Sequence, residues 1–174
     1  MDKAAVKDLF ALEDALKTLL DIQRGLATLL EKKRLTLAAG DAVALADLCR
    51  REKDVAERIQ KTERGRHALM DRLKTSLAGG ASEPSETWSL AVLAERVPEP
   101  VRTRLKVRRA ELVTVMTENQ KNASTVRRAN ERLLQHVGGL ISTLGSAAQG
   151  GAAYGESGRL KSAPVRLSTL NLSA

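Results

Sequence analysis

LFALEDALKTLLDIQRGLATLLEKKRLTL, residues 9–37, places mainly apolar side chains at alternating steps of four and three. The positions on this seam are Leu12, Leu16, Leu19, Gln23, Leu26, Leu30, Lys33 and Leu37. Six of these eight are apolar, a spacing typical of long helices that wind together along a shared face. Leu9, Leu20, Ile22 and Leu29 widen the stripe, which favours a bundle in which this helix has more than one neighbour.

A glycine and an aspartate divide this stretch from a second helical stretch. Gly40 is expected to end a first helix over residues 2–39, and Asp41 is expected to cap a second helix over residues 41–78. Because the connection between them is so short, the two helices should be antiparallel neighbours.

The seam of the second helix contains three polar interruptions, at Glu52, Thr62 and Arg66. We interpret them as positions where packing is weakened, where the helix is exposed to solvent, or where it faces a partner.

The sequence after the second helix is first turn-forming and then helical again. Residues 79–87 (GGASEPSET) predict a loop, followed by a short helix over 88–96 that Ser85 or Thr87 would cap. Two prolines stop this helix, and a third long helix is expected over 101–144.

The composition favours the same fold class. Aromatic residues are 2% of the chain, so the core must be aliphatic, which suits helices better than sheets. Residues 145–174 are rich in Gly, Ala and Ser and hold too few large apolar side chains to offset the entropy of ordering. The sequence therefore predicts an all-α, elongated antiparallel bundle of three long amphipathic, coiled-coil-like helices within residues 1–144, followed by a disordered tail over 145–174.

Few side chains suit catalysis. The chain has one cysteine and two histidines, and His67 and His136 lie on different predicted helices. We therefore expect no metal site, no cofactor and no enzymatic activity. Cys49 fits a reduced compartment, and no run of about twenty apolar residues is present, so we expect a soluble cytoplasmic protein without stable membrane insertion.

The formal net charge is +8, and residues 101–144 contribute 9 − 3 = +6 of it. The basic residues at the start of this segment are Arg102, Arg104, Lys106, Arg108 and Arg109. Nucleic-acid binding would use such charges, but the stacking aromatic residues are missing and the charges spread around the helix. We therefore favour an acidic partner and expect no nucleic acid, with a basic nucleic-acid-associated protein as the less favoured alternative.

The end of the third long helix carries a group of large apolar residues, which we call the apolar strip. It consists of Leu133, Leu134, Val137, Leu140, Ile141 and Leu144. Gly138 and Gly139 lie within it, and each weakens a helix by about 1 kcal/mol relative to alanine. The strip either packs on the first two helices or becomes ordered when another amphipathic helix covers it.

Three features together resemble the FlgN family of flagellar export chaperones. They are the Gly-Asp break after the first long helix, the Asn-x-x-Leu-Leu pattern of Asn130, Leu133 and Leu134, and the Tyr-Gly-x-x-Gly pattern of Tyr154, Gly155 and Gly158.

The resemblance implies a cytoplasmic chaperone that binds the C-terminal helical segments of the hook–filament junction proteins FlgK and FlgL. Such a chaperone prevents their premature assembly and delivers them to the export gate, the FlhA cytoplasmic domain. It also implies that Asn130 and the apolar strip bind cargo, and that Tyr154 and Gly155 bind the gate. The alternative is a self-associating coiled-coil adaptor that uses the same seams.

Overall fold

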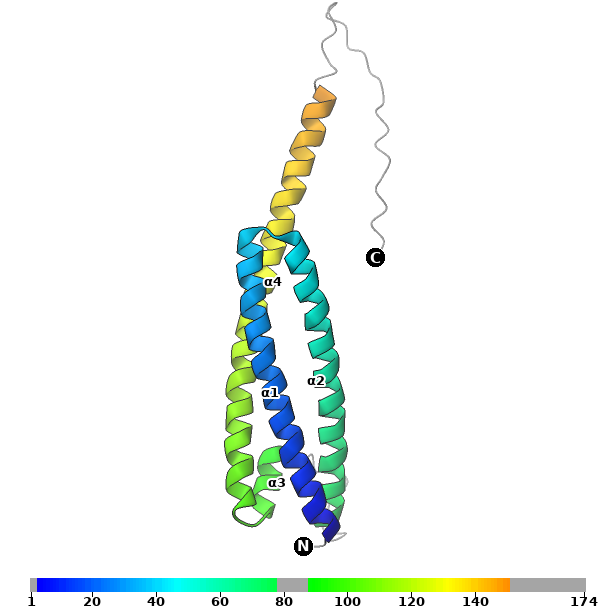
Figure 1. Ribbon diagram of the computed structural model, residues 1–174, viewed down its shortest axis with the longest axis vertical. Helices are drawn as coiled ribbons and strands as arrows, with labels where there is room; N and C mark the ends of the chain where they lie inside the picture. The colour runs from blue at the N-terminus through cyan, green and yellow to red at the C-terminus, as the bar shows by residue number, and fades with distance from the viewer. Residues whose placement is uncertain (1–2, 78–87, 151–174) are drawn as a thin grey trace, which may run out of the picture. The chain divides into compact units, whose positions relative to one another are not determined.

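The computed structural model describes residues 3–77 and 88–150, and every element in these ranges is a helix (Figure 1). The elements are α1 (Lys3–Ala39), α2 (Ala42–Leu77), α3 (Leu90–Arg96) and α4 (Val101–Gly150). The chain divides into two units, Met1–Ala129 and Asn130–Ala174. The prediction of an all-α fold is confirmed.

The junction between α1 and α2 forms where the sequence predicts it. Gly40 has a φ of 71°, in the left-handed region that glycine adopts without a steric penalty. Its N–H donates to the Leu37 carbonyl at 3.2 Å, and the Asp41 N–H donates to the Thr36 carbonyl at 3.3 Å. This pair of bonds is a Schellman motif, which satisfies carbonyls at the helix end. The Asp41 side chain then accepts from the Ala44 N–H at 2.9 Å and caps α2.

Two ion pairs show that α1 and α2 run antiparallel. Near the start of α1, Asp8 accepts two hydrogen bonds of 3.0 Å from the guanidinium of Arg72, which lies late in α2. Near the end of α1, Lys33 donates to Glu52, which lies early in α2. The polar interruption that we predicted at Glu52 therefore lies opposite Lys33, the polar residue in the seam of α1, and bonds to it.

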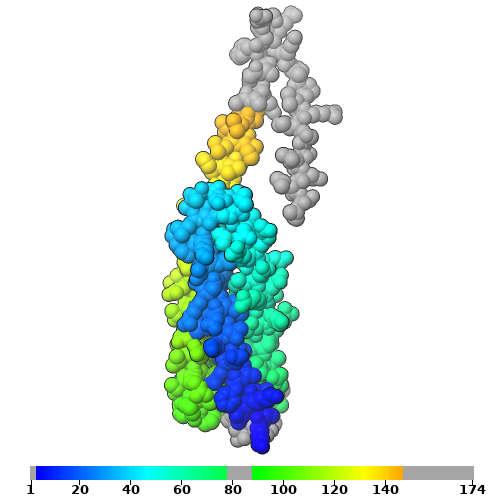
Figure 2. Space-filling view, in the orientation of Figure 1, coloured from blue at the N-terminus to red at the C-terminus, as the bar shows by residue number. Residues whose placement is uncertain are grey.

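The part of α4 in the unit Met1–Ala129 runs parallel to α1. The Arg104 guanidinium bonds to Glu13 at 2.8 Å, and further along both helices Asn119 bonds to Gln23 at 2.8 Å. Within this unit, Figures 1 and 2 show α1 flanked by α2 and by this part of α4. The two flanks explain why the apolar stripe of α1 is wider than one seam. The predicted antiparallel order holds for α1 with α2, whereas α1 and α4 share a direction because α2 returns the chain to the starting end.

Two hydrophobic clusters hold this unit together. The larger cluster consists of Leu9, Leu12, Leu16, Leu19, Leu20, Leu69, Met70, Leu73, Leu93, Ala94, Val97, Leu105 and Leu112. The smaller cluster consists of Leu30, Leu37 and Val126. α1 contributes to both, so its predicted seam forms the centre of the core.

Several helix boundaries differ from the sequence predictions: α2 begins at Ala42 instead of residue 41, and α3 begins at Leu90 instead of residue 88. The cap of α3 is Ser89, whose Oγ accepts from the Val92 N–H at 3.3 Å, and the predicted caps Ser85 and Thr87 lie outside the described residues. α4 continues to Gly150, beyond its predicted end at Leu144, so the prediction of a disordered tail is wrong for residues 145–150. The extra turn contains alanines, which have the highest helix propensity. The predicted disorder of residues 151–174 concerns a segment outside the described residues.

Candidate functional site

The apolar strip is exposed. All six of its side chains lie on α4 in the unit Asn130–Ala174, with exposed fractions from 37% for Leu133 to 69% for Leu144. By contrast, Leu12 and Leu16 on the seam of α1 are 0% and 1% exposed. Burying a leucine or valine side chain is worth about 1.5–3 kcal/mol, so this face has substantial free energy to gain from a cover.

The strip forms one continuous helical face. At about 100° per residue, its six side chains fall within an arc of about 120° around the α4 axis. Asn130, the first residue of the predicted cargo site, lies near the middle of this arc and is half-buried. Such an arc is wide enough to receive an amphipathic helix, and Asn130 places one amide at its beginning.

Gly138 and Gly139 do not interrupt this face. α4 runs through both, and they fall at about 140° and 240° on the same wheel, outside the arc of the strip. A Cβ built on either glycine would meet nothing within 4 Å. The face is therefore already helical in the chain alone, and the glycines are not required for close packing in the described structure.

The predicted gate-binding residues, Tyr154 and Gly155, lie outside the described residues.

Four of the five residues in the basic run at the start of α4 make polar contacts within the chain. The bonds join Arg102 to the carbonyls of Glu95 and Val97, Arg104 to Glu13, Lys106 to Glu95, and Arg108 to Glu111. The Lys106 ammonium, 2.7 Å from Glu95, holds the pKa of that carboxyl below its ordinary value. Phosphate binding would have to break these pairs, so the run is better explained by packing of α4 against its neighbours than by a nucleic-acid surface.

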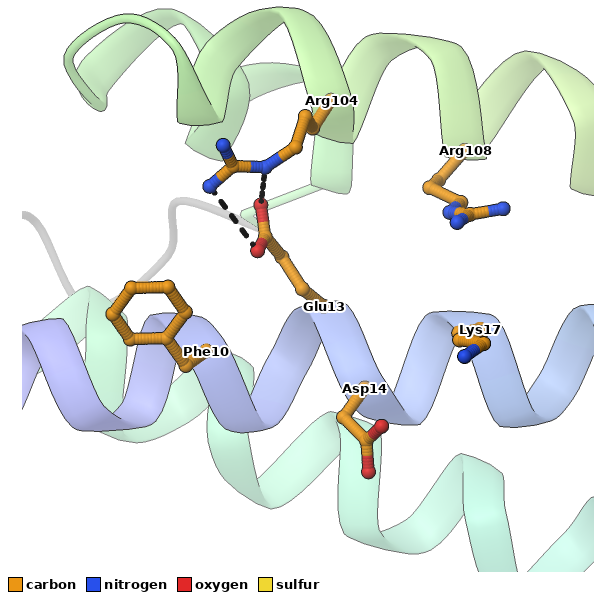
Figure 3. Close-up of a pocket in the computed structure, with 6 residues that line it drawn as sticks. All are labelled: Phe10, Glu13, Asp14, Lys17, Arg104 and Arg108. Atoms are coloured by element: carbon orange, nitrogen blue, oxygen red, sulfur yellow. Dashed lines mark hydrogen bonds and ion pairs between the residues drawn. The ribbon is translucent and has the colours of Figure 1, made fainter.

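A hollow of about 270 Å³ lies between α1 and α4 in the unit Met1–Ala129 (Figure 3). It is lined by Phe10, Glu13, Asp14, Lys17, Arg104 and Arg108. Figure 3 shows that the Glu13 carboxylate faces the Arg104 guanidinium across the hollow, with the Phe10 ring beside them. Because both signs of charge line the hollow and its central pair is already bonded, it favours neither an anion nor a cation.

Other kinds of site are absent from the described ranges. Within residues 3–77 and 88–150, no three His, Cys, Asp or Glu side chains gather where they could hold a metal ion. None of the helices described there combines the length and the apolar character needed to cross a membrane. The apolar strip is therefore the strongest candidate site.

Comparison with known proteins matches the chain to one family. Residues 1–162 match the model of one protein family, which is described as FlgN protein. Nothing among curated proteins or solved structures matches the chain. The matched span includes the apolar strip and Tyr154, and it ends before Leu167.

Proposed function

Because the chain belongs to the FlgN family, a family of flagellar export chaperones, we propose that it is the cytoplasmic chaperone of the hook–filament junction proteins FlgK and FlgL. In this proposal it binds their C-terminal helical segments, prevents their premature assembly and delivers them to the export gate.

The observation that carries the proposal is the exposed helical face of the apolar strip. Junction subunits assemble through terminal helices, so a chaperone for them must cover an apolar helix face until export. Leu133, Leu140 and Leu144 offer an amphipathic cargo helix the matching surface, and they are exposed by 37%, 51% and 69%. Asn130 would bond to a polar group of the cargo at the edge of the contact.

The expected affinity is moderate. An interface of about 600–800 Å² on each partner, at about 25 cal/mol per Å² of apolar area, gives ample gross stabilisation. Loss of translational freedom and ordering of the cargo segment consume most of it. Moderate affinity suits a chaperone, because the cargo must be released at the export gate.

Gate binding would use a separate part of the chain. We assign it to Tyr154 and Gly155, which follow the strip in sequence and do not belong to it. One aromatic ring among glycines can enter a small apolar pocket of the FlhA cytoplasmic domain while the strip holds cargo. The two functions can therefore operate at the same time.

Calorimetry with purified C-terminal segments of FlgK and FlgL tests this proposal, supported by co-expression pull-down. We expect a defined complex with at least one of the two segments. A peptide of the same composition in scrambled order, which lacks the apolar face, should not bind. Absence of binding to both segments would contradict the proposal.

Sedimentation of the chain alone tests the competing interpretation. A self-associating coiled-coil adaptor should be a stable oligomer without any cargo, whereas the proposed chaperone should form its defined complex only when cargo is added. A stable oligomer that binds neither segment would favour the interpretation as a self-associating adaptor.

A further inference from the structure

The sequence contains a second group of leucines that the family match does not cover. Residues 1–162 match the FlgN model, whereas Leu167, Leu170 and Leu172 follow that span. We propose that the segment Leu167–Leu172 of this chain covers the apolar strip of α4 when no cargo is bound. The inference rests on the proposed function only in naming cargo as the competitor for this surface.

The strip needs a cover in the absence of cargo. It presents six large apolar side chains on one arc of α4, and all of them are exposed. Continuous apolar surfaces of this kind promote association with other apolar surfaces. In the absence of cargo, such association would lead to aggregation of the chain. The face of the strip carries no charged side chain, so the complementary cover is an apolar segment.

The connection between the strip and the segment is long enough for this contact. The middle of the strip lies about 18 Å along the helix axis from the end of α4 at Gly150. Residues 151–166 connect Gly150 to Leu167, and a chain of that length reaches up to about 50 Å. The strip from Leu133 to Leu144 is about 16 Å long, and the segment Leu167–Leu172 spans up to about 17 Å. Both the reach and the size of the segment therefore suit the strip.

The same chain has an advantage over a second copy. A segment joined to its site by a short connection has an effective concentration on the order of millimolar. Three leucines make a weak contact, which this effective concentration can populate while micromolar copies of the chain cannot. The contact is also smaller than a complete interface with a cargo helix, so cargo displaces it. The segment would thus shield the strip without blocking its use.

Paramagnetic relaxation tests the contact directly in the full chain. A spin label is attached at Ser173→Cys, with the exposed Cys49 replaced by serine so that only one thiol remains. We expect the label to broaden the methyl signals of Leu133, Leu140 and Leu144 at low protein concentration. Adding the FlgK or FlgL segment that binds should remove the broadening. No broadening of these methyl signals in the free chain would overturn the proposal.

Two variants and a mixing experiment provide the controls. The triple variant Leu167→Asp, Leu170→Asp and Leu172→Asp should lose the broadening, whereas Leu160→Asp, which lies outside the segment, should retain it. Broadening that occurs only between labelled and unlabelled copies in a mixture would identify a second copy as the cover and overturn the proposal.

Cargo affinity separates this inference from the proposed function. If cargo competes with the segment, the triple variant should bind the FlgK or FlgL segment about threefold to tenfold more tightly than the unchanged chain. If no cargo binds at all, the proposed function fails, while the broadening in the free chain still decides whether the segment covers the strip.

Discussion

The side-chain amide of Asn119 donates hydrogen bonds of 2.8 Å to both the side-chain oxygen and the backbone oxygen of Gln23. The two residues are 4% and 6% exposed, so the bonds lie within the contact between α1 and α4. Both are buried polar side chains, and they can pair only when α1 and α4 are aligned in this register. A buried polar pair of this kind has its best-attested use in specifying register.

Replacing one member of this pair should cost more than replacing both. Asn119→Leu leaves the Gln23 side-chain oxygen buried without its donor, and we expect the free energy of unfolding to fall by about 1–3 kcal/mol. The double variant Gln23→Leu, Asn119→Leu should recover most of this loss, because no polar group is then stranded. Chemical denaturation of the three chains measures both effects. Equal stability of the single variant and the unchanged chain would contradict this account.

A charge on the apolar strip should abolish cargo binding. Leu140→Asp places a carboxylate in the middle of the face, where the complex would have to desolvate it, and we expect affinity for the FlgK or FlgL segment to fall at least about tenfold. The matched control is Leu35→Asp, since Leu35 is 54% exposed and Leu140 is 51% exposed. The control should keep its affinity, and both variants should unfold close to the temperature of the unchanged chain. Unchanged calorimetric affinity of Leu140→Asp would count against the cargo site.

Removal of the tyrosine ring should separate cargo binding from delivery. We expect Tyr154→Ala to bind the FlgK or FlgL segment with unchanged affinity, because Tyr154 is not part of the strip, and to reduce export of the junction proteins. The measurements are calorimetry and the amount of FlgK and FlgL secreted by cells carrying the variant. Tyr154→Phe, which keeps the ring, should retain export. Loss of cargo binding together with export would disprove the separation of the two roles.

Alanine should stabilise α4 around the strip without altering its face. Gly138→Ala and Gly139→Ala each add a methyl group where nothing lies within 4 Å. Each gains about 1 kcal/mol of helix propensity, so amide exchange over residues 133–146 should slow by about fivefold per substitution. Cargo affinity should change less than this, because α4 is already helical before cargo binds. Unchanged exchange in both variants would show that the glycines do not limit helix stability there.

The free energy of unfolding should fall as the pH becomes acidic, because the carboxylates of Asp8 and Glu95 are paired with basic side chains. The Arg72 guanidinium, hydrogen-bonded to Asp8, holds the pKa of that carboxyl below its ordinary value, and Lys106 does the same to Glu95. A lowered pKa in the folded chain means that the unfolded chain takes up the proton first as pH falls. Their contribution is therefore present above the unfolded pKa of about 4 and disappears as the pH falls through the folded value. Urea denaturation between pH 7 and 3 should show the loss, and Asp8→Asn should flatten it. An equally steep loss in Asp8→Asn would exclude this pair as a source.

For Lys33 we expect the opposite pH dependence, a loss of stability as the pH rises into the alkaline range. Burial lowers its pKa, but the hydrogen bond and charge of Glu52, together with Cys49, outweigh burial and raise it. This contribution is fully present below the ordinary lysine pKa of about 10.4 and is lost as pH rises through the higher folded value. Glu52→Gln should therefore reduce the alkaline loss of stability in denaturation experiments between pH 9 and 11. An unchanged alkaline slope would show that the pair contributes little.

The sequence by itself determined the elements and the faces they present. A period of three and four residues over 9–37 is enough to specify a helix with an apolar stripe, because side-chain direction follows from helix geometry alone. The Gly40 and Asp41 junction is equally local, since backbone conformation and capping depend on the nearest residues. For the same reason the six residues of the apolar strip could be named in advance as one face of α4.

Tertiary structure alone decided what lies against each face. A period identifies an apolar stripe but carries no information on which segment covers it, so the parallel pairing of α1 with α4 and the exposure of Leu133 to Leu144 were not determined by the pattern. The polar residues show this most clearly. In the sequence, Glu52 is an unexplained polar interruption, and the structure explains it by the bond from Lys33. Likewise, Arg104 is one residue of a basic run in the sequence, and only the structure shows that it bonds to Glu13. Such pairs join residues far apart in sequence, and the interaction of a charge depends on its neighbours in space.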